Sequence, residues 1–277
     1  MIRFAENNDE SSIELVRKIS FPESEKFFVW YKPIFFKPEN TIVYEKNGNI
    51  VSFLERIPFE MDNIGRVTYI FSACTHPDFR KEGLMSQLLE FSEKHDRKTG
   101  VSASVLVPQK EELFDFYEKN GYLPLVKLYK RKYTLGNPKD NSYSFRNCNE
   151  DDIDKLDYVY LENVKETNFI IRTKEYWRSL LSLFNISGGK VFILEQDEKP
   201  VGYAFVWNQK ALVAQELCCL NSDARKIICH EIMELSEKDE ITAYSPVESC
   251  EYKKYGCVKL YNKPENDLPF VMNLMLD

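Results

Sequence analysis

A basic turn in the first third of the sequence contains residue types that bind phosphate. Residues 80–83 hold two basic side chains and one glycine, and they follow a β-rich run at residues 66–75. Pro77 ends this run, because proline donates no backbone N–H. Apolar residues at helical spacing begin at Leu84. The sequence therefore predicts a strand, a tight turn and the exposed beginning of a helix.

This order of elements suits an anionic ligand. The first N–H groups of a helix have no partner within the helix, and the helix dipole places partial positive charge at the same end. A glycine in the turn lets the backbone approach the ligand closely. Phosphate or pyrophosphate is the expected ligand.

Two motifs in the first half of the chain resemble those of one superfamily. Arg80, Gly83 and Met85, spaced in this way after a strand, resemble the Arg/Gln-x-x-Gly-x-Gly/Ala loop of the GNAT acyltransferases. Residues 116–122 resemble the second signature of that superfamily, Phe-Tyr-x-x-x-Gly-Phe/Tyr. Met85 departs from the first pattern, and a side chain of this size fits if it points into the core.

The resemblance implies a function and a set of site residues. It implies an N-acetyltransferase that uses acetyl-CoA as cofactor and transfers the acetyl group directly to a primary amine of a small molecule or peptide. Tyr117 corresponds to the tyrosine that GNAT enzymes often place near the thioester sulfur, so it is the candidate general acid. The following residues are expected to contact the cofactor: Ala73, Cys74, Thr75, Arg80, Lys81, Glu82, Gly83, Leu84, Met85 and Ser86.

The general base stays open. Glu55, Glu60 and Glu112 are the carboxylates near the predicted cleft, but surface glutamate is the ordinary interpretation of each. His76 precedes Pro77 and is expected to be structural. A basic cluster at residues 127–132 could neutralise the 3′-phosphate of the cofactor, although lysines on an edge strand would give the same pattern.

The elements that must position these residues can be assigned along residues 1–135. Helices are expected from residue 9 and over residues 23–36, followed by a hairpin at residues 41–57 that turns at Asn47 and Gly48. After the strand, turn and helix described above come a strand at residues 101–107, a helix at residues 111–122 and a strand at residues 123–133. This order matches the superfamily, so the fold class is α/β with a mixed central sheet flanked by helices.

The second half of the chain resembles the first. A linker is predicted at residues 136–142, and helices, strands and turns in residues 143–277 follow in a similar order, ending with a strand at residues 240–244 and a short helix at residues 248–256. Residues 221–226 replace the basic turn and contain no glycine. The sequence therefore predicts two GNAT-like units in tandem, catalytic residues 1–135 and a degenerate unit at residues 143–277. This is similar to acetyltransferases of the enhanced-intracellular-survival type without their sterol-carrier-like domain.

Composition excludes several other classes. Seven cysteines without C-x-x-C spacing and three histidines argue against a zinc site, so no metal is expected and the thiols are expected to be free. A net charge of −7 argues against nucleic-acid binding. Apolar runs are too short to span a membrane, and the N-terminus has no secretory signal, so a cytoplasmic location is expected. A homo-oligomer is possible.

Two other functions fit the same fold. A non-catalytic acyl-CoA sensor or scaffold would keep Arg80 and Gly83 without turnover. An aminoacyl-transferase of the peptidoglycan cross-bridge type also pairs two GNAT units, but such enzymes lack a working phosphate loop, so the turn at residues 80–83 counts against this alternative.

Overall fold

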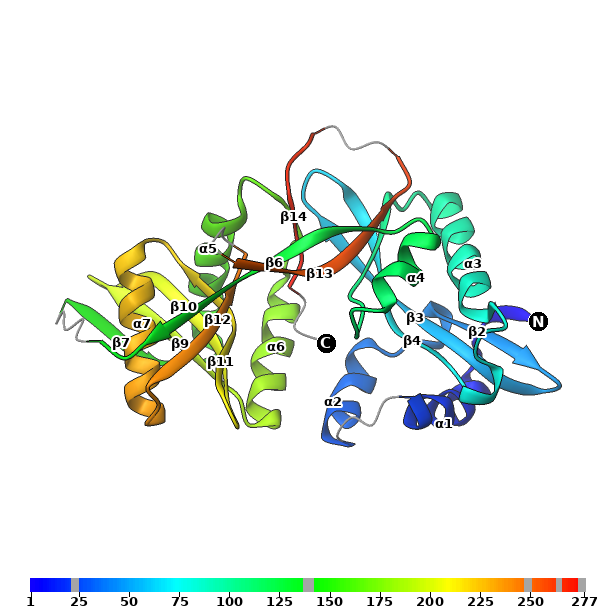
Figure 1. Cartoon of the computed structure of the whole chain (residues 1–277), viewed down its shortest axis with the longest axis horizontal. Helices are drawn as coiled ribbons and strands as arrows, with labels where there is room; N and C mark the ends of the chain where they lie inside the picture. Colours follow the sequence, from blue (N-terminus) through cyan, green and yellow to red (C-terminus); the bar gives the residue numbers. More distant parts are fainter. Residues whose placement is uncertain (21–24, 137–141, 247–250, 263–265, 274–277) are drawn as a thin grey trace. The chain divides into compact units, whose positions relative to one another are not determined.

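The computed structural model describes residues 1–20, 25–136, 142–246, 251–262 and 266–273. It divides into two compact units (Figure 1). Unit 1 contains Met1–Leu125 and Tyr255–Asp267, and unit 2 contains Val126–Lys254 and Leu268–Asp277. Among the described residues, no helix combines the length and apolar character needed to cross a membrane.

Unit 1 holds a mixed sheet in the order β1-β2-β3-β4-β5-β13. Its strands are β1 (Ile2–Phe4), β2 (Thr41–Lys46), β3 (Asn49–Met61), β4 (Gly65–Thr75), β5 (Ala103–Leu106) and β13 (Glu251–Leu260). β4 and β5 are parallel, and the other neighbours are antiparallel. The β2–β3 hairpin turns at Asn47 and Gly48, both at positive φ, as the sequence predicted.

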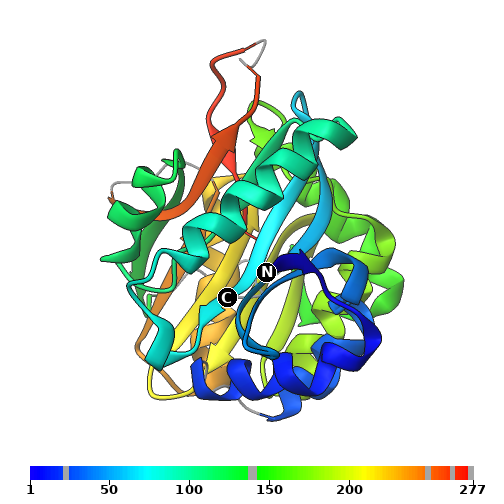
Figure 2. The ribbon, with the colours of Figure 1, turned by 90° about the vertical axis from the view of Figure 1, so that its right-hand side faces the viewer.

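Helices cover both faces of this sheet. They are α1 (Glu10–Ser20), α2 (Glu25–Phe35), α3 (Leu84–Thr99) and α4 (Leu113–Lys119). Ile42 and Leu54 pack with apolar residues of α3 and α4, whereas their neighbours Val43 and Phe53 pack with α1. Because side chains alternate along a strand, these are two cores on opposite faces. Figure 2 shows α3 and the dark blue α1 and α2 on different sides of the strands.

Unit 2 repeats the plan of unit 1. Its sheet order is β6-β12-β11-β10-β9-β7, in which only β11 and β12 are parallel. The strands are β6 (Leu123–Thr134), β7 (Tyr143–Asn147), β9 (Lys190–Gln196), β10 (Lys199–Asn208), β11 (Leu212–Cys219) and β12 (Glu240–Ser245). The helices are α5 (Ile153–Val164), α6 (Lys174–Ser187) and α7 (Ser222–Ser236). Each unit is therefore mixed α/β.

The last strand of each sheet comes from the other half of the sequence. β13 pairs with β5 through Cys257–Leu260, and β6 pairs with β12 through Tyr129–Thr134. The compact units therefore differ from the predicted domains at residues 126–135 and 255–267. Most of the predicted linker, residues 137–141, lies outside the described residues.

The predicted short helix at residues 248–256 is wrong where the structure describes it. Residues 251–256 belong to β13, and residues 247–250 lie outside the described part. The likeness to the end of α4 suggested a helix, but Tyr255, Cys257 and Val258 are buried in a strand that pairs with β5. Tertiary pairing decides the conformation here.

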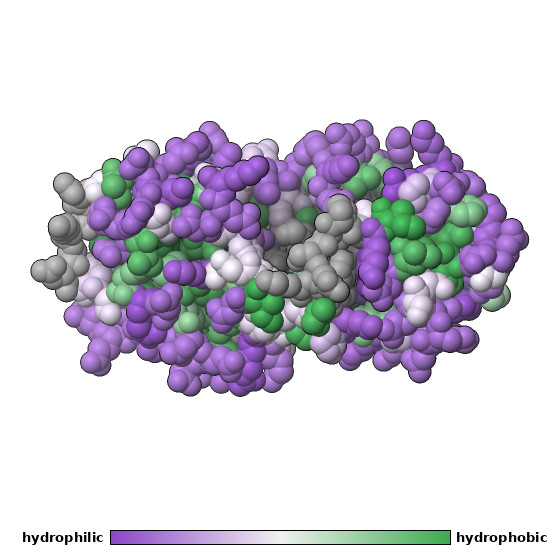
Figure 3. All heavy atoms as spheres, turned by 90° about the horizontal axis from the view of Figure 1, so that it is seen from below, coloured by the Kyte–Doolittle hydropathy of each residue, from purple (hydrophilic) through white to green (hydrophobic). Residues whose placement is uncertain are grey.

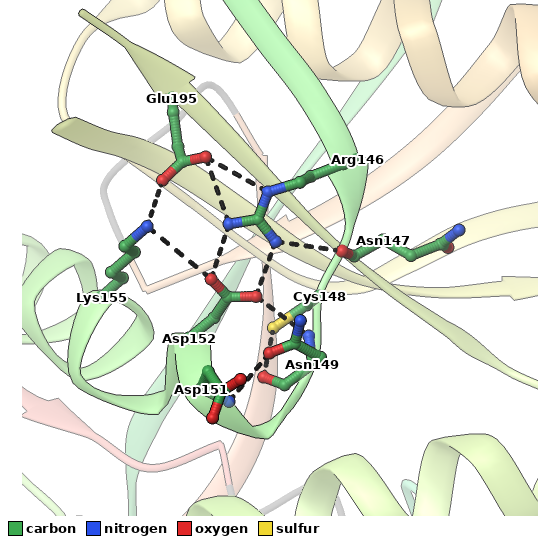
Figure 4. A network of polar contacts seen from close by, with 8 residues as sticks. All are labelled: Arg146, Asn147, Cys148, Asn149, Asp151, Asp152, Lys155 and Glu195. Atoms are coloured by element: carbon green, nitrogen blue, oxygen red, sulfur yellow. Dashed lines mark hydrogen bonds and ion pairs between the residues drawn. The ribbon is translucent and has the colours of Figure 1, made fainter. Parts of the chain in front are cut away.

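A similar ion-pair network supports the edge strands β1 of unit 1 and β7 of unit 2. In unit 2, Arg146 of β7 donates to both oxygens of Asp152 at 2.7 and 2.6 Å and to Glu195 at 3.3 Å (Figure 4). Lys155 also contacts Glu195, at 2.5 Å. In unit 1, Arg3 of β1 contacts Asp9 at 2.5 Å and Glu45 at 3.0 Å.

The C-terminal segment belongs to the sheet of unit 2. β14 (Phe270–Val271) pairs with β8 (Asn168–Phe169) and, at Val126, with β6. Beyond it, Asn273 Nδ2 donates to the Gln215 carbonyl of β11 at 3.1 Å. Arg172 Nη2 donates to the Asn273 carbonyl at 2.8 Å. These bonds fix the segment beside β11, past the end of its pairing with β12.

The face of the molecule in Figure 3 is mostly hydrophilic, and it shows apolar areas on both units. In unit 1, α1 and α2 expose Leu15, Ile19, Val29 and Ile34. Six cysteines lie in the described residues, and all are free, in agreement with the expectation from composition.

Candidate functional site

The basic turn connects β4 to α3 through a short 3-10 helix, Pro77–Phe79. His76 begins this helix, and its Nδ1 accepts from the Asp78 N–H at 3.3 Å, which agrees with a structural role for His76. Arg80 Nε donates to the Thr75 carbonyl at 3.1 Å. Arg80, the first residue of the basic turn, is thus held at the end of β4.

The backbone of the turn exposes a row of N–H donors. Lys81 and Gly83 have φ values of +68° and +76°, and Gly83 is the N-cap of α3. The first bond of this helix runs from the Gln87 N–H to the Gly83 carbonyl at 3.2 Å. Within the described residues, no acceptor faces the N–H groups of residues 81–86. These donors can bind the oxygens of a phosphate or pyrophosphate.

The charges around this turn also favour an anion. The first turn of α3 contains no acidic residue. Glu82, the only acid within residues 80–86, pairs with Lys46 at 2.8 Å, so its charge is offset. The side chains of Arg80 and Lys81 are exposed. Positive charge and free donors therefore coincide at the N-terminus of a sixteen-residue helix.

β4 and β5 separate immediately before this turn. They pair from Val67↔Ala103 to Ile70↔Leu106, and β4 then continues through residues 71–75 without a β5 partner. We call this divergence the β4–β5 fork. Backbone groups of β4 beyond Ile70 can therefore pair with an extended ligand on the side that β5 has left.

Ala73, Cys74 and Thr75 lie on this part of β4. The side chain of Cys74 is buried in the α1 face of the sheet, and burial raises its pKa to about 12. A thiol of this kind stays protonated and is not a nucleophile. Ser52 Oγ donates to the Cys74 carbonyl at 2.9 Å and lies 2.8 Å from Thr75 Oγ1. Only backbone contacts to a ligand are open to Cys74.

Tyr117 lies on α4 and is 8% exposed. It belongs to the core that joins α3, α4 and the central strands, against which Ala73 and Met85 also pack. Its ring contacts that of Tyr122 edge to face, at 5.9 Å between centroids. Burial raises its pKa well above the ordinary value, so the phenol keeps its proton at neutral pH. Within the described chain its hydroxyl has no hydrogen-bond partner.

The packing of Met85 explains its departure from the superfamily pattern. Its side chain is half-buried and contacts the same core as Tyr117. A larger residue is tolerated at this position because it points away from the exposed N–H groups of the turn.

A cavity of about 400 Å³ lies between α3 and the end of α4. It begins at Ser86 and includes Lys119 and Lys259. Lys259, from β13, contacts Glu93 at 2.5 Å and the Asn120 carbonyl at 2.8 Å. Sequence reasoning missed Lys259, because nothing in its neighbourhood indicates that β13 joins unit 1.

The remaining candidates lie elsewhere. Glu60 and Glu112 are exposed, and Glu55 is buried against Arg17 and Tyr31. The basic cluster at residues 127–132 lies on β6, whose residues 129–134 pair with β12 at the end of the unit 2 sheet. Lys132 lies 3.6 Å from Glu240.

In unit 2, the N-terminus of α7, which corresponds to that of α3, is occupied by its own capping side chain. Asn221 caps α7, and its Oδ1 accepts from the N–H groups of Asp223 and Ala224 at 3.1 and 2.8 Å. Asp223 adds negative charge to the first turn. The Asn221 side chain occupies the N–H groups that an anion would otherwise bind. The N-terminus of α7 is therefore a poor site for a phosphate.

Residues 2–125 match the family model for the acetyltransferase (GNAT) domain. A search of curated proteins found no match to the sequence. The match places this domain in unit 1, where the basic turn, the β4–β5 fork and Tyr117 lie together.

Solved structures share the fold at low identity. A probable N-acyltransferase from Enterococcus faecalis is 15% identical, with a TM-score of 0.75 over 94% of this chain and 72% of that one. Eis1 from Mycobacterium abscessus is 12% identical, with a TM-score of 0.66 over 94% and 73%. A tandem GNAT protein from the clavulanic acid biosynthesis pathway is 12% identical, with a TM-score of 0.58 over 95% and 99%. At such identities the likeness shows the fold.

Proposed function

We propose, from the GNAT domain in residues 2–125 and the donor row of the basic turn, that this protein is an acetyl-CoA-dependent N-acetyltransferase. Unit 1 would be catalytic, and unit 2 would be a degenerate copy. The acceptor would be a primary amine of a small molecule or peptide. The observation that carries this proposal is the set of unpartnered N–H groups at residues 81–86.

The residues present fit the cofactor along its length. The pyrophosphate would bind the backbone of Lys81, Gly83, Leu84, Met85 and Ser86, with Arg80 and Glu82 shaping the turn around it. The extended arm would pair with the backbone of Ala73, Cys74 and Thr75 in the fork. The nucleotide end would enter the adjoining cavity, where the charges of Lys119 and Lys259 are balanced by Glu90 and Glu93 and Lys259 pairs with Glu93.

Acyl transfer needs an amine that attacks a carbonyl carbon and a thiolate that leaves. When bound, acetyl-CoA supplies the activated thioester. Tyr117 would donate a hydrogen bond to the sulfur, because its raised pKa keeps the phenol protonated. Burial around it excludes water, which strengthens such a hydrogen bond. The base that receives the amine proton is unassigned.

Two glycine variants test the cofactor site. Gly83 and Gly48 both have positive φ and no atom within 4 Å of an added Cβ, so Gly83→Ala and Gly48→Ala should cost similar stability, about 1–2 kcal/mol. Only Gly83→Ala changes the donor row. We expect it to weaken acetyl-CoA binding by about tenfold in calorimetry, the effect of about 1.4 kcal/mol. Gly48→Ala should bind as the wild type does. Equal affinities of all three proteins would contradict the proposed site.

Two measurements on the wild-type protein, its melting temperature and thiol release, distinguish an enzyme from a sensor. Acetyl-CoA should raise the melting temperature, and acetyl-pantetheine, which lacks the pyrophosphate, should raise it much less. Thiol release should then appear with at least one member of a panel of polyamines, aminoglycosides, amino acids and peptides. Stabilisation without thiol release from any acceptor would favour a non-catalytic acyl-CoA sensor.

A further inference from the structure

The C-terminal segment of unit 2, residues 268–273, is held largely through its backbone carbonyls. Asn168 of β8 donates from its backbone N–H to the Pro269 carbonyl at 2.8 Å. Its side chain donates from Nδ2 to the Leu268 carbonyl, also at 2.8 Å. The strand that follows, β14, is only two residues long. These contacts are typical of an extended peptide that binds by strand addition, in which main-chain hydrogen bonds provide affinity.

Arg172, which binds the end of this segment, is held in place by contacts outside it. The side chain is buried, and Nη1 and Nη2 donate to the two carboxylate oxygens of Glu216, each at 2.7 Å. The guanidinium carbon lies 4.1 Å from the ring centre of Tyr160 and 4.6 Å from that of Trp177. Nη2 also donates to the Asn273 carbonyl at 2.8 Å. This donor is therefore positioned whether or not the segment is bound.

The chemistry of the unit 2 fork suits a peptide better than a phosphate. Glu216 balances the charge of Arg172, so the fork offers a hydrogen-bond donor without net positive charge. Asn221 already occupies the first N–H groups of α7. On the strand side, where β11 has separated from β12, the Gln215 carbonyl accepts from Asn273 Nδ2 at 3.1 Å. A donor for a carbonyl and an acceptor for an amide match the polar groups of a peptide.

The segment occupies this fork without being part of the main strand order. β14 lies outside the order of the unit 2 sheet and pairs with β8 and, at Val126, with β6. Its departure would break none of the pairs within that order. Oδ1 of Asn168 and Nε of Arg172 are buried and, within the described part of unit 2, have no hydrogen-bond partner. The fork therefore holds polar groups that the segment leaves unused. The segment also buries the side chains of Phe270, Val271, Met272 and Asn273.

We propose that the fork of unit 2 is a binding groove for an extended peptide, and that residues 268–273 occupy it as a reversibly bound ligand of the same chain. The ligand class is a peptide with aromatic and aliphatic side chains before an amide side chain, as in Phe270, Met272 and Asn273. Unit 2 thus keeps a fork that accepts an extended ligand, but a peptide takes the place of an acyl-CoA arm. This inference does not depend on acetyl-CoA binding by unit 1.

Cutting the chain before the segment tests this proposal. A protease recognition sequence inserted after Asn262 lets the full chain fold before it is cut, and the segment then stays bound only by its own affinity. A fluorescent synthetic peptide of residues 266–277 should replace the cut fragment within hours, which fluorescence anisotropy measures. The same peptide should raise the melting temperature of the cut protein in proportion to the logarithm of its concentration. The uncut chain is the control and should bind the peptide at least about 10²-fold more weakly, because its own segment competes at a high effective concentration.

Peptide variants show whether the groove is specific. The Phe270→Ala peptide should bind at least about tenfold more weakly, because a buried aromatic side chain is lost. The Asn273→Ala peptide should bind about fivefold more weakly, the usual effect of one lost hydrogen bond. The Asp267→Ala peptide changes an exposed residue and should stay within about twofold of the natural sequence.

Three results would overturn the proposal. A cut fragment that does not exchange within a day, while the protein stays folded, would show that the segment is a permanent part of the core. A fragment that leaves without rebinding of the peptide would show that the groove has no affinity for it. Equal binding of the natural and Phe270→Ala peptides would show that the binding is not specific. If the cut protein unfolds when the fragment leaves, the dependence of its melting temperature on each peptide still decides.

Discussion

At the scale of single residues, Tyr117 illustrates how burial changes what a side chain can do. A phenol in water has a pKa near 10, and burial on α4 raises the pKa further. The group is therefore a constant hydrogen-bond donor across the physiological range rather than a titrating acid. Its role in acyl transfer would be to stabilise negative charge on the leaving sulfur.

Tyr117→Phe isolates this role. The ring packs against Tyr122 and Phe116 and stays in the variant, while the hydroxyl is lost. We expect acetyl-CoA affinity within about twofold of the wild type. We also expect kcat to fall by about 10²-fold or more, as when a donor that stabilises developing negative charge is removed. Thiol-release kinetics with the best acceptor measure the ratio, and an unchanged kcat would reject the assignment of Tyr117.

Asp152 is a second residue whose pKa is set by its surroundings. The hydrogen bond from Arg146 lowers its pKa below the ordinary value, and its partner in unit 1, Asp9, is lowered in the same way by Arg3. A lowered pKa means that the folded protein favours the charged carboxylate. This stabilisation is present above the unfolded pKa and is lost as the pH falls through the folded one.

Asp152→Asn should therefore destabilise the protein in a pH-dependent way. At pH 7 we expect a loss of about 2 kcal/mol, the scale of a hydrogen bond to a charged group. The difference from wild type should begin to shrink as the pH falls below about 4, the ordinary pKa of the unfolded carboxyl group, and should disappear only below the lowered pKa of the folded one. Denaturant unfolding at several pH values measures it. Asp151→Asn, an exposed neighbour, is the control and should change stability by less than about 0.5 kcal/mol.

At the scale of elements, the local sequence pattern is sufficient to predict a helix, strand or turn wherever that segment alone determines its structure. The hairpin at Asn47 and Gly48, the strand β4 and the helix α3 follow from turn chemistry and hydrophobic period, and the structure confirms them. The turn between β4 and α3 was predicted for the same reason. Its phosphate contacts stay a prediction, because they require a ligand.

The exchanged strands could not be predicted in this way. β13 carries the exposed residues Tyr252, Lys253 and Lys254 before its buried half, so no single period marks it as a central strand. Its partner β5 lies far away in the sequence, and pairing over such a distance leaves no local signal. Lys259 was missed for the same reason, although it lines the cavity next to Ser86.

The repeat has one further sequence signal. Arg3 and Asp9 are six residues apart, as are Arg146 and Asp152, and each arginine lies in the edge strand of its sheet. This pair marks the edge strand of each sheet and the helix that follows it. The network lies at the edge strands β1 and β7, away from the strands that form the forks. Its role is therefore structural.

At the scale of the whole molecule, the two units differ in what fills their forks. β11 and β12 pair only at two positions, Val213↔Thr242 and Ala214↔Ala243, so unit 2 also has a fork. There the chain's own C-terminal segment bonds to Gln215 through Asn273. Together with the capped N-terminus of α7, this contact leaves unit 2 without the donor row and the open strand that unit 1 has.

We therefore expect one acetyl-CoA site in each chain. Calorimetric titration should give a stoichiometry of one, and Gly83→Ala should weaken that single transition. Asn221→Ala, which removes the cap of α7, should cost stability of about 1 kcal/mol without creating a second site, because the fork of unit 2 stays filled. Two transitions of similar affinity in the wild type would contradict this expectation.

The position of β13 in the first unit also constrains how the protein is made. When β5 leaves the ribosome, the strand that will complete its sheet is still about 150 residues from synthesis, since Leu106 pairs with Cys257. At about 5–20 residues per second, this delay lasts roughly 8–30 s. During that time the nascent chain presents β5 as an open edge, which can associate with other chains. A message truncated within the second half would thus yield an incomplete first half as well.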